Sequence, residues 1–89
     1  MFDRTHYQEV PSLLLDSLIR YGEHGIQTGG FLRYVLANDL AGAVVNADPA
    51  SLRAIVPLVR FIHNEMPYGS HGSNATVTRW LKEHEEARA

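Results

Sequence analysis

The 89-residue chain has no cysteine, which excludes disulfide bonds, thiolate nucleophiles, zinc fingers and iron–sulfur sites. It also lacks an excess of positive charge, because eight basic and ten acidic residues give a formal net charge of −2. Proteins that bind nucleic acid or anionic membranes usually carry a basic surface, so neither kind of partner is expected. No run approaches the roughly 18 consecutive apolar residues of a membrane span, and the N-terminus lacks the apolar segment of a signal peptide. We therefore expect a cytoplasmic protein.

The composition is that of an ordinary globular domain, with 45% hydrophobic and 20% charged residues. A chain of this length forms one domain and buries only about 60 to 65% of the surface that its unfolded form exposes. Its core is therefore small. Small cores often gain stability by association, most commonly as a cyclic dimer, so we expect a homodimer.

Residues 1–10 are polar and mixed, and we expect them to form a flexible N-terminal arm. The packed domain then begins at Pro11, because proline is favoured in the first turn of a helix. An apolar stripe at helical spacing follows and predicts a helix over about 11–24 that stops at Gly25. At the other end of the chain we expect residues 87–89 to fray, because the acidic side chains before them oppose the helix dipole.

A second apolar stripe predicts a helix over about 28–47, with Thr28 as its N-cap. Asn38 and Asp39 interrupt this stripe with two residues that favour helix ends and turns. A bent helix, or two short helices with the second capped by Asp39, is therefore as well supported as one straight helix. In another interpretation, the two polar side chains bind the edge of a ligand or complete a hydrogen-bond network under Tyr34.

The clearest helix start is Asp48 with the proline that follows it, since a capping carboxylate then precedes a proline in the first turn. It predicts a helix over about 49–65 with a kink at Pro57, because proline removes a backbone hydrogen bond inside a helix. A last helix over about 74–86 begins after Ser73, which is a favourable N-cap.

No alternating strand pattern or repeat is found, so the sequence predicts an all-α fold, a compact bundle of four to five short helices with a single domain over 11–86. Neither a P-loop nor a dinucleotide-binding fingerprint is present, and the histidines lack the spacing of metal ligands. We expect no catalytic residue, no metal and no cofactor. The stripes assign nine residues to the core: Leu15, Leu18, Phe31, Val35, Leu36, Ile55, Val59, Ile62 and Trp80.

The sequence TGGFLR at 28–33, followed by Val35-Leu36 and by Asn38-Asp39-Leu40, is the most specific motif of the chain. Further residues of the pattern are Tyr21, 23–26, Asn64, Glu65, Pro67, Gly72, Ser73, Trp80 and Leu81. With them the chain between about 17 and 81 resembles small uncharacterised proteins of tailed bacteriophages and prophages. It departs from that pattern at Gln27 and His71, where the family has proline and an aromatic residue. The resemblance implies a viral origin and a place in the host cytoplasm, and it brings no activity.

The glycines of this motif predict a shaped corner between two helices. Free N–H groups at a helix start attract anions, so a small anionic or nucleotide-like ligand is one interpretation; tight helix packing with a solvated Arg33 is the other. Because Gly29 and Gly30 each cost ~1 kcal/mol of helix stability relative to alanine, we expect backbone shape or a close approach to require them. The candidate ligand-binding residues are His24, Thr28, Gly29, Gly30, Arg33, Asn38 and Asp39.

Small size, helical patterning, the phage-like resemblance and the lack of a catalytic motif predict a non-enzymatic accessory protein that binds a host or phage protein. The alternative is a protein that binds a small anion at the helix start near Thr28. An exposed apolar patch favours the first function. A pocket lined by Arg33 and free helix N–H groups favours the second.

Overall fold

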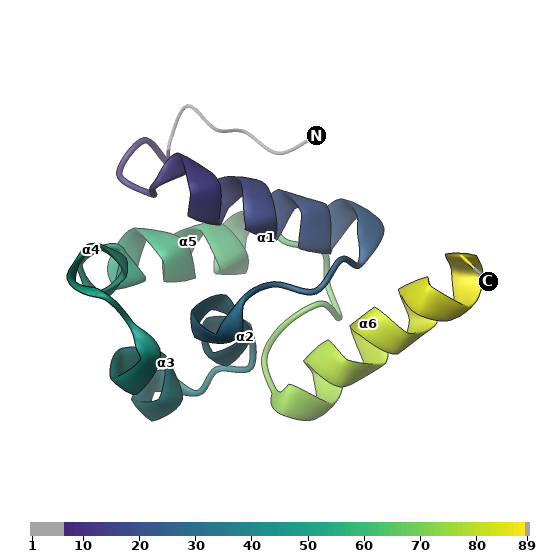
Figure 1. Ribbon diagram of the computed structural model, residues 1–89. Helices are drawn as coiled ribbons and strands as arrows, with labels where there is room; N and C mark the ends of the chain where they lie inside the picture. Colours follow the sequence, from purple (N-terminus) through teal and green to yellow (C-terminus); the bar gives the residue numbers. More distant parts are fainter. Residues whose placement is uncertain (1–6, 89) are drawn as a thin grey trace.

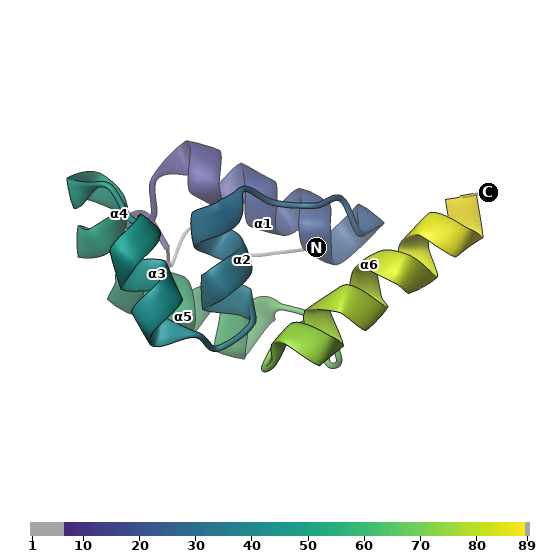
Figure 2. The same ribbon diagram turned by 60° about the horizontal axis from the view of Figure 1, so that its bottom comes forward.

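Figure 1 shows the computed structural model of the chain, which describes residues 7–88. These residues form six α-helices and no strand, so the all-α prediction is confirmed. The helices are α1 (Ser12–His24), α2 (Gly30–Leu36), α3 (Leu40–Asn46), α4 (Pro49–Arg53), α5 (Ile55–Glu65) and α6 (Asn74–Arg88). In both views α3 and α4 lie at one end of the molecule, and α6 extends from the opposite end (Figures 1 and 2).

The second apolar stripe forms two helices, because Asn38 adopts the left-handed conformation with φ 60° just beyond the end of α2. The side chain of Asp39 then caps α3 by accepting a hydrogen bond of 2.9 Å from the N–H of Gly42. Of the alternatives that the sequence leaves open, the structure therefore shows the break into two helices, with Asp39 as the cap of the second. The predicted cap at Thr28 is wrong, since Gly29 occupies the N-cap position of α2 and no side chain bonds to it there.

The segment predicted as one helix over 49–65 is also two helices, which is why six helices replace the expected four to five. Asp48 starts α4 as predicted and accepts a hydrogen bond of 2.7 Å from the N–H of Ser51, which lowers the pKa of the Asp48 carboxyl. The interruption lies at Ala54 rather than at Pro57. In an unbroken helix the proline ring would clash with the carbonyl four residues earlier. With the break at Ala54, Pro57 falls in the first turn of α5, where its missing N–H needs no partner.

The core lies where α1, α2 and α5 meet, and α6 adds Val77. The largest fully buried side chains are Tyr21, Phe61, Leu18, Leu36, Leu58, Val77 and Ser70. Of the predicted core residues, Leu15, Leu18, Leu36 and Ile62 are buried, and Phe31, Val35, Ile55 and Trp80 are partly buried. The assignment of Val59 is wrong, because its side chain is 49% exposed. The core-facing side of α5 carries Leu58 and Phe61 together with the predicted Ile62.

Part of the expected N-terminal arm belongs to the packed body. Tyr7 and Val10 are buried, and the ring of Tyr7 meets that of Phe61 edge to face with 4.9 Å between centroids. The Tyr7 hydroxyl donates a hydrogen bond of 2.9 Å to the Glu65 carboxylate. The rest of the segment predicted as an arm, residues 1–6, lies outside the described residues.

A buried polar group joins α1 to the loop between α5 and α6. The Tyr21 hydroxyl donates a hydrogen bond of 2.6 Å to the carbonyl of Ser70, and burial raises the pKa of this phenol. The Ser70 hydroxyl in turn donates to the carbonyl of Pro67 at 2.6 Å. The Trp80 indole N–H of α6 donates to the backbone carbonyl of Tyr21 at 2.9 Å, so one residue of α1 holds both the loop and α6.

Candidate functional site

The predicted anion site centres on Arg33, whose guanidinium is already engaged. Its Nη2 donates hydrogen bonds to Asn74 Oδ1 at 3.0 Å and to Thr78 Oγ1 at 2.9 Å, both on α6. The Nε atom is buried without a hydrogen-bond partner. Arg33 therefore links α2 to α6, and its charged group is held away from the position of a clamp at the α2 start.

The other residues of the predicted corner do not converge on a cavity. A Cβ added at Gly29 or Gly30 would meet nothing within 4 Å, and Gly29 has an ordinary φ of −70°. The expectation that shape or close approach requires these two glycines is therefore wrong. The Thr28 hydroxyl bonds to the adjacent Gly29 carbonyl, and the carbonyl of His24 accepts a hydrogen bond of 2.7 Å from Arg88. Arg88 belongs to the segment 87–89, which was expected to fray. In the structure α6 continues to Arg88, and residue 89 lies outside the described range.

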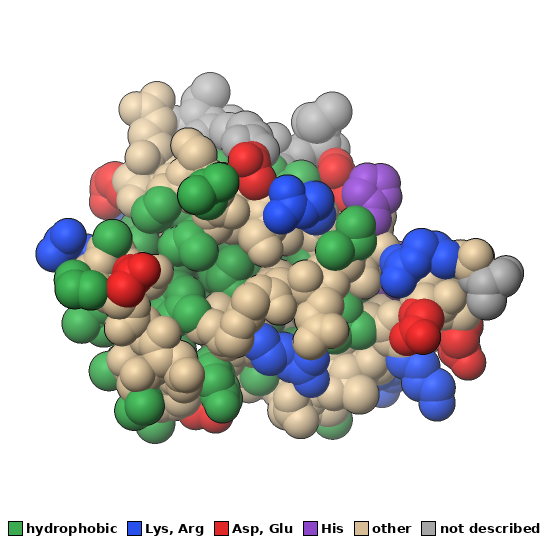
Figure 3. Space-filling model, viewed as in Figure 1, with side chains coloured by type: hydrophobic (Ala, Val, Ile, Leu, Met, Phe, Trp, Pro, Cys, Tyr) green, Lys and Arg blue, Asp and Glu red, His purple; other side chains and the backbone are tan. Residues whose placement is uncertain are grey.

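Large apolar side chains are exposed together on another part of the molecule, which we call the α3–α5 face. Figure 3 shows apolar side chains gathered over α3 and α4 and charged side chains gathered over α6 at the opposite end. Residues 40–59 contain two charged residues, Asp48 and Arg53, whose formal charges cancel. The α3–α5 face consists of Leu40, Val44, Val45, Leu52, Val56 and Val59, each 44 to 82% exposed.

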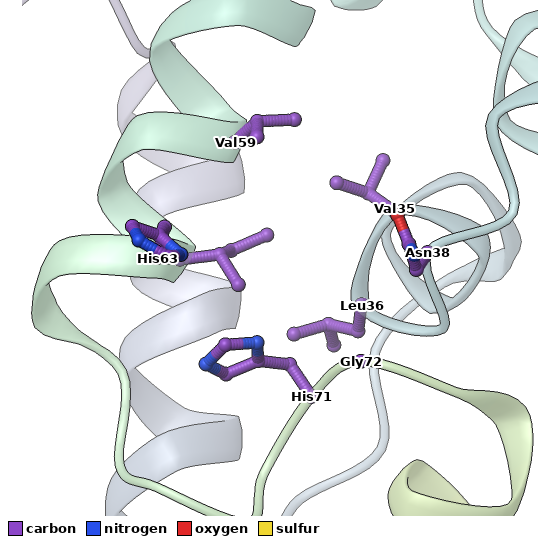
Figure 4. Close-up of a pocket in the computed structure, with 8 residues that line it drawn as sticks. Val35, Leu36, Asn38, Val59, His63, His71 and Gly72 are labelled. Atoms are coloured by element: carbon purple, nitrogen blue, oxygen red, sulfur yellow. The ribbon is translucent and has the colours of Figure 1, made fainter.

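A groove runs along this face where α2 and α3 approach α5. Its smaller hollow, of about 50 Å³, lies between Leu40 and Ala43 of α3 and Ile55 of α5. The larger hollow, of about 240 Å³, continues toward the loop after α5 (Figure 4). Val35, Asn38 and Val59 line both hollows, so the two hollows lie next to each other. Asn38 is the predicted site residue that this groove includes.

Two histidines lie at the far end of the groove. His63 comes from α5 and His71 from the loop before α6, and Figure 4 places their rings beside the larger hollow, across from Val35 and Leu36. Burial lowers the pKa of His71, and the neighbouring charge of His63 lowers it further. The groove therefore presents apolar walls with two imidazole groups at one end.

We expect the protein to lose stability on acidification through His71. Because the folded-state pKa of this group lies below its ordinary value of 6.5, the unfolded chain binds the proton more readily. The stabilising contribution is present above about pH 6.5 and is lost as the pH falls toward the folded-state pKa. Melting temperatures measured between about pH 7 and 5 should fall in the wild type and fall less in His71→Gln.

The matched control is His24→Gln, which changes an exposed histidine at the end of α1. This variant should keep the pH dependence of the wild type. If the melting temperature falls equally with pH in His71→Gln and in the wild type, His71 is not the source of the loss of stability on acidification.

Within residues 7–88, no three His, Asp or Glu side chains are grouped closely enough to hold a metal ion. No helix of that part of the chain is long and apolar enough to cross a membrane. A scan against protein-family models and searches of curated proteins and of solved structures give no match. The α3–α5 face with its groove is thus the site on which a functional argument rests. A sequence signal for it exists in the scarcity of charge across residues 40–59.

Proposed function

We propose that the chain is a non-enzymatic accessory protein that acts by binding another protein, and that the α3–α5 face is its binding surface. The observation that carries the proposal is the group of six large apolar side chains exposed on α3, α4 and α5, within a stretch of chain, residues 40–59, that contains only two charged residues. Contiguous exposed apolar patches beyond a few hundred Å² are rare in monomeric proteins and often mark interaction sites.

The energetics favour a protein partner for this face. Burying apolar surface contributes about 25 cal/mol per Å², and well-packed side chains that enter a pocket at the centre of an interface supply most of the affinity. The groove offers two such pockets beside Val59. Charged side chains are depleted at the core of protein interfaces, as they are on this face.

The resemblance to small phage and prophage proteins supports a host or phage protein as the partner, met in the cytoplasm of the host cell. The chemistry of the face narrows the partner further. The two charges within residues 40–59 cancel, and such a segment exerts little attraction on a strongly charged molecule, so the partner presents apolar side chains that fit the groove.

The experiment is covalent cross-linking in host cells, identification of the linked protein, and titration of that purified protein against the full chain. Val45→Asp and Val56→Asp place a charge on the face at positions 82% and 59% exposed. We expect each to weaken binding at least tenfold. Tyr68→Asp, at a fully exposed position on the loop after α5, is the control and should bind like the wild type. Equal affinities for all four proteins would overturn the proposal.

A further inference from the structure

The α3–α5 face also matches a surface of the same composition. The two charged residues among residues 40–59, Asp48 and Arg53, have opposite signs. A copy of the face therefore meets no net repulsion. The charged side chains of α6 lie at the other end of the molecule (Figure 3).

We infer that the free protein is a symmetric homodimer in which the α3–α5 face of each copy covers the α3–α5 face of the other. This inference rests on the proposed function: a second copy of the chain covers the face until a host or phage partner displaces it. In a two-fold contact the same patch serves both copies, so each apolar projection must find a hollow on an identical surface.

The α3–α5 face contains both apolar projections and a hollow. Leu40 and Val56 project into solvent, 66% and 59% exposed, and the smaller hollow lies between α3 and α5, with Leu40 on its wall. Each copy therefore offers apolar side chains to the groove of the other and receives side chains in its own.

The area suits a dimer of modest affinity. A standard interface buries about 800 Å² on each partner. The six exposed side chains supply several hundred Å² of apolar surface, and the exposed residues Ala41, Pro49 and Ala50 extend it. A contact of this size depends on concentration, so monomer and dimer should both be observable.

The test is sedimentation equilibrium of the full chain from low to high micromolar concentration. We expect the mass to rise from 10.0 kDa toward twice that value. Val45→Asp and Val56→Asp should raise the dissociation constant at least tenfold, and Tyr68→Asp should leave it unchanged. Circular dichroism and melting curves verify that the variants are folded.

A mass of 10.0 kDa at every concentration, or a dimer that both face variants retain, would overturn the inference. The proposed function has a separate outcome. A monomeric protein whose affinity for an identified partner falls in Val56→Asp would contradict the homodimer and leave the proposed function intact. If Val56→Asp breaks the dimer but binds the partner as the wild type does, the homodimer stands and the proposed function is contradicted.

Discussion

Gly25→Ala is expected to destabilise the fold by roughly 2 to 5 kcal/mol, because two costs combine at this position. Gly25 ends α1 in the left-handed conformation with φ 64°, which is unfavourable for a residue with a Cβ. A Cβ there would also collide with Cβ and Cγ of His84 on α6. These atoms lie near the helix backbone, so α6 itself must move. Chemical denaturation followed by circular dichroism measures the change in the free energy of unfolding.

Gly30→Ala is the matched control for this prediction. A Cβ at this first residue of α2 would meet nothing within 4 Å, and alanine favours a helix more than glycine does. The free energy of unfolding should stay within about 0.5 kcal/mol of the wild type or rise slightly. If Gly30→Ala is destabilised as much as Gly25→Ala, the contact between Gly25 and His84 does not explain the effect.

Leu36→Ala is expected to cost about 2 to 5 kcal/mol of stability, a large share of what a small domain possesses. The Leu36 side chain is 1% exposed in the core, and it also forms a wall of the larger hollow of the groove. Truncation removes buried methyl groups and leaves a cavity that the surrounding helices fill only in part. Thermal or urea unfolding measures the change in the free energy of unfolding. The slope of the urea dependence is compared between the variants.

Leu13→Ala makes the same chemical change at a leucine that is 84% exposed in the first turn of α1. Its stability should remain within about 0.5 kcal/mol of the wild type. A small loss in Leu36→Ala, similar to that in Leu13→Ala, would show that α2 does not contribute to the core as the structure indicates.

Local signals in the sequence were enough to predict the helical segments and several of their ends, but not the interruption at Ala54. Asp39, Asp48 and Ser73 each accept a hydrogen bond from a backbone N–H three residues later, and Gly25 is the left-handed stop of α1. Such signals work because a cap depends only on the few residues around it. The all-α class followed from the same helical periodicity.

Contacts between distant parts of the chain limited the rest of the prediction. Gly29 and Gly30 looked like the glycines of a close approach, but the close approach occurs at Gly25, against a side chain 59 positions later. Arg33 looked like an anion ligand, and its partners Asn74 and Thr78 lie more than forty residues away. Nothing in the spacing of these residues indicates which of them meet.

The apolar pattern also failed to separate the core residues from those of the α3–α5 face. Val59 and Leu58 are adjacent on α5, yet one is 49% exposed and the other is fully buried. A helix that is apolar on two sides gives a broad stripe, which does not show which side faces inward. The candidate face was therefore partly counted as core, although its scarcity of charge was visible in the sequence.

The most direct test of the central claim is site-specific photo-cross-linking in host cells, with benzoylphenylalanine in place of Val56. This position is 59% exposed on the α3–α5 face, and the fully exposed Tyr68, in the loop after α5, provides a reference position outside the six residues of that face. The account predicts defined protein adducts at position 56, either to a second copy or to a host or phage partner, and none at position 68. Absence of adducts at position 56, or equal adducts at both positions, would contradict the claim that this face binds protein.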